Sequence, residues 1–268
     1  MIGKKIKNFI SLLQSKPEQD ENKPAYESEQ TVDLYRQQQP FLQAGEKVIL
    51  QLLEKEISAM SMLDIGVGAG RTTYFFAPRV KQYLGMDYSA TMIKACKALY
   101  PSLAFEVGDV RTLTYKDSSF DFLLFSFNGL DSISPTDRHT ALKEIYRVLA
   151  PGGYFAFSTH HLGGIDKLFQ LPISLNVKRW YKMLVLRTAN KGYQHFKQQH
   201  HAIILDGANG YTISNYYTAV DFQLHQLVEL GFEDIQIINM QGEVIVADQA
   251  KRDKDLWFHF LCHKPGRS

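Results

Sequence analysis

A glycine-rich turn carries the strongest chemical signal in the sequence. Residues 63–71 read LDIGVGAGR, so an acidic residue, Asp64, stands two positions before the first of three alternating glycines. Glycine lets a backbone adopt φ > 0 and approach a ligand without a Cβ clash. The dinucleotide fingerprint GxGxxG would need glycine at position 71, where this chain has Arg71. The spacing therefore favours a nucleotide-like ligand other than a dinucleotide, and a tight turn with no ligand is the alternative.

Two further acidic residues, Asp87 and Asp109, follow the ends of the next two predicted strands. Asp87, in the segment GMDYS, can accept hydrogen bonds from both hydroxyls of a ribose, and Tyr88 beside it can pack on an adenine face. Asp109, in the segment EVGDV, can accept from an adenine amino group while the Val110 N–H donates to a ring nitrogen. Each position alone is common in turns or at helix starts. Together with the glycine turn they predict an adenosine-containing ligand.

These residues need a scaffold that brings several strand ends together. Short apolar runs alternate with helical periods from about residue 46. Strands are expected at 61–65, 82–86, 103–107, 120–126, 154–159, 234–240 and 256–263, and helices at 70–77, 90–99, 136–149 and 219–230. Such alternation predicts an α/β fold, with a doubly wound, parallel sheet covered by helices on both faces.

The combined pattern resembles the class I S-adenosylmethionine-dependent methyltransferases. The resemblance rests on Asp-x-Gly-x-Gly-x-Gly at 64–70, on Asp87 and Asp109, and on the segment LAPGG at 149–153. It covers about residues 60–160 and, in architecture only, 219–263. It implies a Rossmann-like, seven-stranded sheet whose last strand is antiparallel. It also implies S-adenosylmethionine as the methyl donor, with S-adenosylhomocysteine as its product.

The resemblance also assigns donor-binding residues. They are Tyr35, Asp64, Gly66, Gly68, Arg71, Asp87, Tyr88, Asp109, Val110 and Ser126. The two glycines would approach the methionine moiety, and the Ser126 carbonyl would accept from its amino group. Tyr35 and Arg71 are candidates for its carboxylate, with ordinary surface side chains as the alternative.

The acceptor side is expected just beyond the fifth strand. His160 stands there as a candidate general base, which the reaction needs only if the acceptor arrives protonated. Asn128 and Tyr217 are expected to face the acceptor with it. The alternatives are that His160 and His161 form a polar pair at a strand end and that Tyr217 anchors neighbouring structure. No metal site is expected, because the histidines lack metal-ligand spacing.

Two segments fall outside the resemblance. Residues 1–45 form an N-terminal arm, interpreted either as a mobile leader or as a lid that orders over the cofactor, before the methyltransferase domain at 46–268. Residues 162–217 form a cap insertion between strands five and six. The cap contains a predicted hairpin, 202–205 with 211–216, over the carboxyl ends of the strands, where open α/β sheets bind ligands.

The cap carries an uneven charge. Residues 162–200 hold seven lysines and arginines against one acid, Asp166, for a net charge of +6. A solvated basic face is one interpretation. A rim that selects an anionic or peptidic acceptor is another, and a surface for membrane or RNA is a third.

These features predict a methyltransferase that acts on a small molecule or natural-product intermediate, with O- or N-methylation favoured over C-methylation. A macromolecular methyltransferase acting on protein, peptide or RNA is the alternative, as is a noncatalytic protein that binds an adenosine cofactor. The acceptor atom is not encoded in any motif, since the Asn-Pro-Pro-Tyr type signature is absent and the chain reads Ser126-Phe127-Asn128-Gly129 there.

Composition sets the remaining expectations. A net charge of +2 gives no global attraction to nucleic acid or membrane. No stretch approaches the roughly 20 apolar residues of a membrane span. The two cysteines, Cys96 and Cys262, have no disulfide or metal spacing, which fits a reducing, cytoplasmic location. The oligomeric state is left open.

Overall fold

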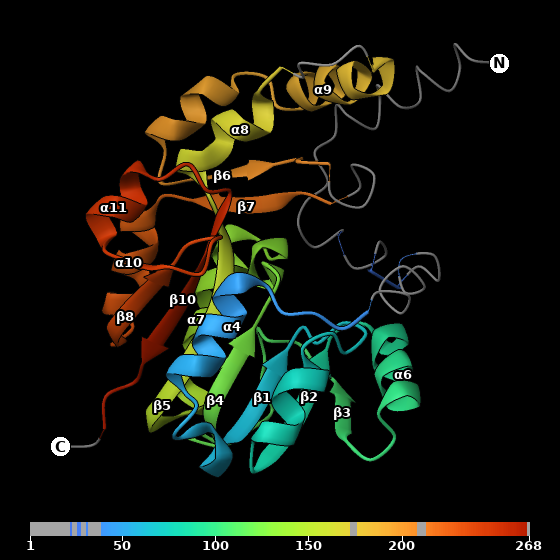
Figure 1. Ribbon diagram of the computed structural model, residues 1–268, viewed down its shortest axis with the longest axis vertical. Helices are drawn as coiled ribbons and strands as arrows, with labels where there is room; N and C mark the ends of the chain where they lie inside the picture. The colour runs from blue at the N-terminus through green and yellow to red at the C-terminus, as the bar shows by residue number, and fades with distance from the viewer. Residues whose placement is uncertain are drawn as a thin grey trace.

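The computed structural model describes residues 22, 26, 27, 31, 39–171, 176–207 and 213–266. Figure 1 shows a twisted sheet with helices on both faces. Beyond one end of its strands lies a further layer. That layer comprises α8 (Ile165–Phe169), α9 (Val177–Ala189), β6 (His201–Ile204) and β7 (Asn215–Thr218). Tyr35, a candidate donor residue, lies outside the described residues.

The main sheet runs in the order β3-β2-β1-β4-β5-β10-β8-β9. Its strands are β1 (Ser61–Ile65), β2 (Gln82–Asp87), β3 (Ala104–Val107), β4 (Phe120–Phe125), β5 (Leu149–His161), β8 (Glu233–Ile238), β9 (Val244–Ile245) and β10 (Trp257–His263). The first five pair in parallel, whereas β10 is antiparallel to both β5 and β8. The Rossmann-like sheet with an antiparallel last strand is confirmed, and β6, β7 and β9 are additions to it.

Helices cover both faces of this sheet. On one face lie α4 (Ala44–Leu52) and α5 (Thr73–Phe76), and on the other lie α7 (Pro135–Val148), α10 (Val220–Glu229) and α11 (Ala247–Arg252). The helix α6 (Ala90–Leu99) packs against β2 and β3. This is the two-sided arrangement that the alternation of strands and helices predicts.

The two faces form two separate apolar cores. Successive side chains of a strand point to opposite faces, so a strand buried on both sides is apolar throughout. In β4, Leu123 and Phe125 pack with the α7 side, while Phe122 and Leu124 pack with Ile49 of α4. Packing on both faces fixes the position of each strand end. The candidate site residues lie at these ends.

The helix after the glycine turn is shorter than expected. The sequence predicts a helix over 70–77, but α5 begins at Thr73 and continues as a 3₁₀ turn over Ala77–Arg79. Gly70 has φ +85°, a left-handed conformation that cannot start an α-helix. The glycine turn thus extends further along the chain than its sequence pattern indicated.

The Pro151-Gly152-Gly153 segment is also different from the expectation. The strand expected at 154–159 begins earlier, at Leu149, so this segment lies inside β5. The pairing with β4 shifts register between Phe120 and Phe122, so the segment forms an irregularity within the strand. The Gly152 N–H and the Gly153 carbonyl both bond to Lys264, which holds this irregularity against the end of β10.

The predicted hairpin exists with a shifted second strand. Its first strand, β6, matches the expected range closely, but β7 begins only at Asn215 and extends to Thr218. Residues 208–212, at the expected start of that strand, lie outside the described residues. Besides pairing with β6, β7 pairs in parallel with the end of β5, with Tyr217 beside His160. This pairing joins the cap directly to the candidate acceptor side.

Among the described residues, every helix is too short or too polar to cross a bilayer. Both cysteines are buried and unpaired.

Candidate functional site

The glycine turn follows β1, the strand at which the chain order of the sheet reverses direction. Gly66 and Gly68 both have positive φ, at +63° and +56°. A Cβ on Gly66 would come within 2.6 Å of the Phe125 ring, so a larger residue would both strain the backbone and clash. Open α/β sheets bind ligands at such reversal points, outside the carboxyl ends of the strands. The turn is therefore shaped for close approach to a ligand.

Asp87 ties the end of β2 to this turn. Its Oδ2 accepts from the Gly68 N–H at 2.9 Å, and its Oδ1 accepts from the Ser89 N–H at 2.9 Å. Burial raises the pKa of this carboxyl, although the two backbone donors oppose that rise. A carboxylate offers about four acceptor sites, so two remain for ligand hydroxyls. Tyr88 beside it is half-buried and contacts the Tyr26 ring edge-on, with ring centres 6.0 Å apart.

Asp64 is fully buried under the glycine turn. Its Oδ2 accepts from the Thr72 hydroxyl and the Tyr83 hydroxyl, both at 2.7 Å. Its Oδ1 has no hydrogen-bond partner among the described residues. Burial raises the pKa of Asp64 to about 6, against the lowering effect of its two hydroxyl donors. A buried acceptor without a donor is costly, and a ligand ammonium or ordered water is the kind of group that would relieve it.

Asp109 and Val110 follow β3, as the sequence predicts for the adenine edge. The Asp109 carboxylate is 38% exposed and is held by Arg111, whose guanidinium approaches it to 2.7 Å. The Val110 side chain is buried, and its N–H donates no hydrogen bond within the described part of the chain. The backbone donor is therefore available to a ligand, whereas the carboxylate already has an ionic partner.

Arg71 is held by side chains from three parts of the chain. Its guanidinium makes two short bonds, 2.6 and 2.7 Å, to the fully buried carboxylate of Glu46 on α4. It stands 5.0 Å from the ring centres of both Phe41 and Phe127, and it donates to the Ser126 hydroxyl at 3.2 Å. Because Glu46 occupies both terminal nitrogens, Arg71 serves here as a structural clamp between α4 and the end of β4. The Ser126 carbonyl accepts from the Gly129 N–H.

On the acceptor side, His160 is held by the buried carboxylate of Asp131. Its Nδ1 lies 2.8 Å from Asp131 Oδ2, which also accepts from the His160 backbone N–H at 2.7 Å. Asp131 is fully buried, and its Oδ1 accepts from Arg138 at 2.9 Å and from the Thr159 hydroxyl at 2.7 Å. Arg138 is itself fully buried and donates to Gln223 at 2.6 Å. The carboxylate therefore orients the His160 ring, with Nδ1 as the donor nitrogen and Nε2 as the acceptor nitrogen.

Three side chains surround the Nε2 edge of His160. The Asn128 amide nitrogen lies 3.1 Å from Nε2, and the buried Asn128 Oδ1 has no partner among the described residues. The Tyr217 ring stacks on the His160 ring, with centres 4.5 Å apart. The Tyr217 hydroxyl donates at 3.0 Å to Asp206, whose carboxylate stands 3.9 Å from Nε2. The structure thus brings together the three residues predicted for the acceptor side.

The turn that carries Asn128 is strained. Phe127 and Asn128 are consecutive non-glycine residues with positive φ, +54° and +56°. Such residues persist only when the surrounding structure holds them, and they gather at functional sites. Here the Asn128 N–H donates to the Ser158 hydroxyl at 2.7 Å. This bond places the Asn128 side chain against His160.

Part of the N-terminal arm reaches both sides of the site. Tyr26 meets Tyr88 on the donor side, and its hydroxyl lies 3.0 Å from the Ser132 hydroxyl, next to Asp131. Asn22 is buried and donates to the backbone carbonyls of Ser132 and Ser214. These two arm residues span from the donor strands to the cap.

Several functional neighbours were not identified from the sequence. They are Asp131, Arg138, Asp206 and Tyr26. One signal was available: Arg138 shares the apolar stripe of its helix with Leu142 and Ile145, and a buried arginine requires an anion. The other three approach their partners only in the folded protein. The local sequence pattern therefore does not predict their contacts.

Three of the cap cations are engaged away from His160. Arg187 donates to the Phe169 carbonyl at 2.8 Å, Lys197 pairs with Asp166, and Lys167 approaches Asp255 at 3.7 Å. The described side chains that contact the His160 ring are acidic or neutral, namely Asp131, Asn128, Asp206 and Tyr217. Within the described residues, no group of three or more His, Cys, Asp or Glu is arranged to hold a metal ion.

Comparison with known proteins identifies the domain. Residues 62–153 match a family model described as a methyltransferase domain. A demethylmenaquinone methyltransferase of Streptomyces avermitilis is 37% identical over 95 residues, which are 35% of this chain and 40% of the relative. A malonyl-[acyl-carrier protein] O-methyltransferase of Erwinia billingiae is 31% identical over 121 residues, or 43% and 47% of the two chains. This chain therefore spans less than half the length of either curated relative.

Solved structures share the fold over more of the chain. The structure of a putative S-adenosylmethionine-dependent methyltransferase from Listeria monocytogenes superposes with a TM-score of 0.58 at 20% identity. It covers 82% of this chain and 98% of that one. One from Clostridium acetobutylicum superposes with a TM-score of 0.59 at 12% identity, over 83% and 92%. The match over residues 62–153 and the shared fold identify in this chain a methyltransferase domain of the class I S-adenosylmethionine-dependent family.

Proposed function

We propose that this protein transfers a methyl group from S-adenosylmethionine to a small acceptor held at His160. One observation carries the proposal: the hydrogen bond from the Gly68 N–H to Asp87, which joins two donor motifs at the reversal point of the sheet. The cofactor supplies a methyl group already activated on a sulfonium. The protein's contribution is then to hold the two reactants in line in a dry site.

The residues present fit this cofactor. Gly66 and Gly68 have the open, left-handed backbone that close approach requires, and Asp87 keeps acceptor capacity for ribose hydroxyls. The buried Oδ1 of Asp64 lacks a donor among the described residues and matches a ligand ammonium in charge. The Val110 N–H is available for adenine. Arg71 is the weakest of the assigned donor residues, because Glu46 already neutralises it.

His160 acts in this proposal as the general base. Asp131 orients the ring and stabilises the imidazolium that forms when Nε2 takes a proton, while Arg138 balances the buried carboxylate. This is the role that a buried carboxylate has beside a catalytic histidine in hydrolases. Nε2 would take a proton from the acceptor as the methyl group transfers. Asn128, whose Oδ1 lacks a donor among the described residues, would accept a second hydrogen bond from the acceptor.

The charges around His160 favour a neutral hydroxyl or an amine as the acceptor group. Asp206, whose carboxylate lies 3.9 Å from Nε2, would repel an anionic acceptor, whereas Arg138 balances the charge of Asp131. Three of the seven cap cations, Lys167, Arg187 and Lys197, contact groups away from His160. We therefore favour O- or N-methylation of an uncharged or cationic small molecule over the anionic acceptor.

Two further proposals concern the segments around the site. Residues 162–217 would serve as the acceptor cap, supported by Tyr217 and Asp206, which reach His160 from it. Residues 1–45 would serve as the donor lid, supported by the contacts of Tyr26 with Tyr88 and Ser132. The two buried free cysteines suit a reducing compartment such as the cytoplasm.

The direct test is product formation from S-adenosylmethionine. The full chain is incubated with the donor and a panel of alcohols, phenols and amines, with demethylmenaquinone and malonyl-[acyl-carrier protein] included because relatives are named for them. Release of S-adenosylhomocysteine with a hydroxyl or amine acceptor supports the proposal. Turnover confined to carboxylates would contradict the acceptor class, and failure to bind the donor at all would contradict the function.

A further inference from the structure

The cap helix α9 has an apolar stripe that faces solvent. Val177, Trp180, Tyr181 and Leu184 are 79%, 45%, 52% and 65% exposed. Their spacing of i, i+3, i+4 and i+7 places them along one side of the helix. Exposed apolar side chains in a contiguous set are unusual on a soluble surface and mark an interaction site.

The stripe is separate from the face that holds α9 in the protein. Val185 and Leu186 are buried, and Leu186 packs with Phe169 and Ile204 in the core of the cap. The helix is therefore already anchored without the exposed residues. Among the described residues, none of the apolar cores includes Val177, Tyr181 or Leu184, so their apolar character needs another explanation.

Cations accompany the stripe. Arg179 and Lys182 are exposed on the same helix, and Lys191 follows it. Over residues 162–200 the chain has seven cations and one acid, a net charge of +6, which leaves the rest of the chain with 23 cations and 27 acids, a net charge of −4. The positive charge is thus concentrated around α9 while the remainder of the protein is negative. Such polarity favours one orientation against an anionic surface.

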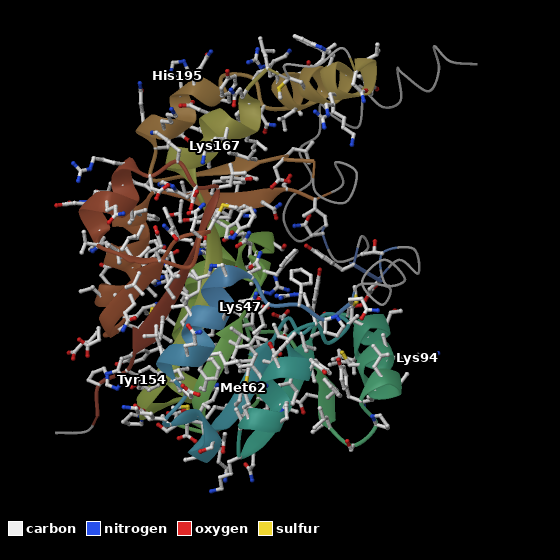
Figure 2. All side chains as sticks on the ribbon, in the orientation of Figure 1. Lys47, Met62, Lys94, Tyr154, Lys167 and His195 are labelled. Atoms are coloured by element: carbon white, nitrogen blue, oxygen red, sulfur yellow. The ribbon has the colours of Figure 1, made fainter. Side chains whose placement is uncertain are left out.

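The helix also stands at an extreme of the molecule. Figure 1 shows α9 in the outermost layer, beyond β6 and β7, at the opposite end from the lower edge of the sheet. Figure 2 shows Lys167 and His195 in this same layer, far from Lys94 on α6. A broad, flat partner can therefore meet α9 without touching the sheet.

The mixture of side chains indicates the kind of partner. Aliphatic residues such as Leu184 and Val177 gain little against the phosphates of a nucleic acid. At a lipid surface the aliphatic side chains enter the acyl boundary, Trp and Tyr rings sit at headgroup level, and Lys and Arg meet the phosphates. All three classes of side chain are present on α9. We propose that α9 docks this protein on the surface of a bilayer containing anionic phospholipid.

Sedimentation with lipid vesicles tests this docking. The full chain is mixed with vesicles of phosphatidylcholine alone and with vesicles in which part of it is replaced by phosphatidylglycerol. We expect binding to the phosphatidylglycerol vesicles that weakens as salt rises. The charge reversals Arg179→Glu and Lys182→Glu together should lower that binding by roughly tenfold or more. The pair Tyr181→Ser and Leu184→Ser should lower it on vesicles at every salt concentration.

A matched control reverses two exposed cations on another helix. Lys94→Glu with Lys97→Glu on α6 changes the net charge by the same amount and should leave vesicle binding within about twofold, because these residues lie away from α9. Unchanged binding of S-adenosylhomocysteine and unchanged thermal unfolding show that each variant is folded. If the α9 and α6 variants weaken binding equally, net charge alone is responsible and the proposal is wrong.

Tryptophan fluorescence gives a second readout. The chain has two tryptophans, Trp180 on α9 and Trp257 in β10. In a Trp257→Phe background, we expect Trp180 emission to shift to shorter wavelength with phosphatidylglycerol vesicles and not with phosphatidylcholine alone. No shift in either case overturns the proposal. Salt-sensitive binding of RNA in place of vesicles, or a dimer that Leu184→Ser dissociates, would also overturn it and assign the stripe to that partner.

Discussion

The donor side and the acceptor side of this site are built in different ways. The donor side uses glycines with positive φ and acidic residues at the ends of adjacent strands, all within residues 64–110. The acceptor side joins His160 to Asp131, across β5 and the turn after β4, and to Asp206 and Tyr217 of the cap. The conformation of the backbone shapes the donor side. Hydrogen-bonded and stacked side chains shape the acceptor side.

This difference has a consequence for specificity. A backbone cradle is set by glycines and tolerates few changes, because a Cβ at Gly66 or Gly70 would meet an aromatic ring at 2.6 or 2.7 Å. A cluster of side chains supported by a cap can be rebuilt by substitution without disturbing the sheet. The donor side is therefore suited to one constant cofactor, and the acceptor side is where substrate choice would vary.

The largest effect is expected at the acceptor base. His160→Ala removes the ring that Asp131 orients, so turnover with a protonated acceptor should fall roughly 10²–10⁴-fold. The measurement is the initial rate of S-adenosylhomocysteine release with whichever acceptor supports turnover. His195→Ala, an exposed histidine of the cap, is the matched control and should keep the wild-type rate. A near-normal rate for His160→Ala would mean that placement alone drives the transfer.

On the donor side, stability and binding should change in opposite directions. Asp64 is charged at pH 7 because its pKa of about 6 lies below that pH, although burial raises this pKa from the ordinary 3.8. A raised pKa gives stability at low pH that is lost as pH rises through 6, so the charged group destabilises the free protein at pH 7. Asp64→Asn should therefore increase the free energy of unfolding by about 2–3 kcal/mol. It should also weaken S-adenosylhomocysteine binding roughly tenfold.

Denaturant unfolding and calorimetry measure the two effects. Thr72→Val, which removes one donor to Asp64, is the comparison that should destabilise instead, because it leaves the carboxylate with less support. Weaker binding without a gain in stability would indicate that Asp64 is needed for packing rather than for the ligand.

One buried histidine on each side of the site should contribute to the loss of folding stability at low pH. His161 adjoins the acceptor base, and His259 lies beside Gln43 on the donor side. Burial lowers the pKa of each to about 4, below the ordinary 6.5. A lowered histidine pKa gives stability that is present above pH 6.5 and is lost as pH falls toward 4. Each histidine should cost about 2 kcal/mol between pH 7 and pH 5.

Unfolding curves at the two pH values check this expectation. His161→Gln and His259→Gln should each flatten the loss, and the double variant should flatten it most, even if both variants are less stable at pH 7. An unaltered pH dependence in the double variant would show that other groups control acid unfolding.

The smallest effect is expected at the arm residue that touches both sides. Tyr26→Phe keeps the ring against Tyr88 but removes the hydroxyl that meets Ser132. Binding of S-adenosylhomocysteine should weaken by about 1 kcal/mol, or roughly fivefold. Tyr74→Phe, on an exposed ring of α5, is the control and should leave binding unchanged. Equal affinity for wild type and Tyr26→Phe would separate the arm from donor binding.

The sequence predicted the sheet and the donor motifs because both depend on local pattern. The strand at 61–65 and the helix at 90–99 match β1 and α6 residue for residue. Strands buried on both faces are uniformly apolar, and glycines at positive φ are needed wherever the backbone turns that way. Such features are encoded by neighbouring residues.

Other features were missed because they depend on contacts between distant residues. The Pro151-Gly152-Gly153 segment has the composition of a turn, but backbone hydrogen bonds with Lys264, more than a hundred positions later, hold it inside β5. The sequence around Asp131 is typical of a turn. Its hydrogen bonds with Arg138 and His160 form only in the folded protein. The cap helix α9 lacks a single polar face, because it is apolar on its buried side and again on its exposed side. No periodic pattern distinguishes such a helix from an irregular apolar segment.

The division of the site into a donor side and an acceptor side is tested most directly by calorimetric titration of S-adenosylhomocysteine into three proteins. Wild type should bind it and should not bind NAD. Asp87→Ala should lose affinity by about 1–3 kcal/mol, because hydrogen bonds to ribose hydroxyls disappear. His160→Ala should bind as wild type does. Wild-type affinity in a folded Asp87→Ala protein, or an equal loss in His160→Ala, would contradict this account.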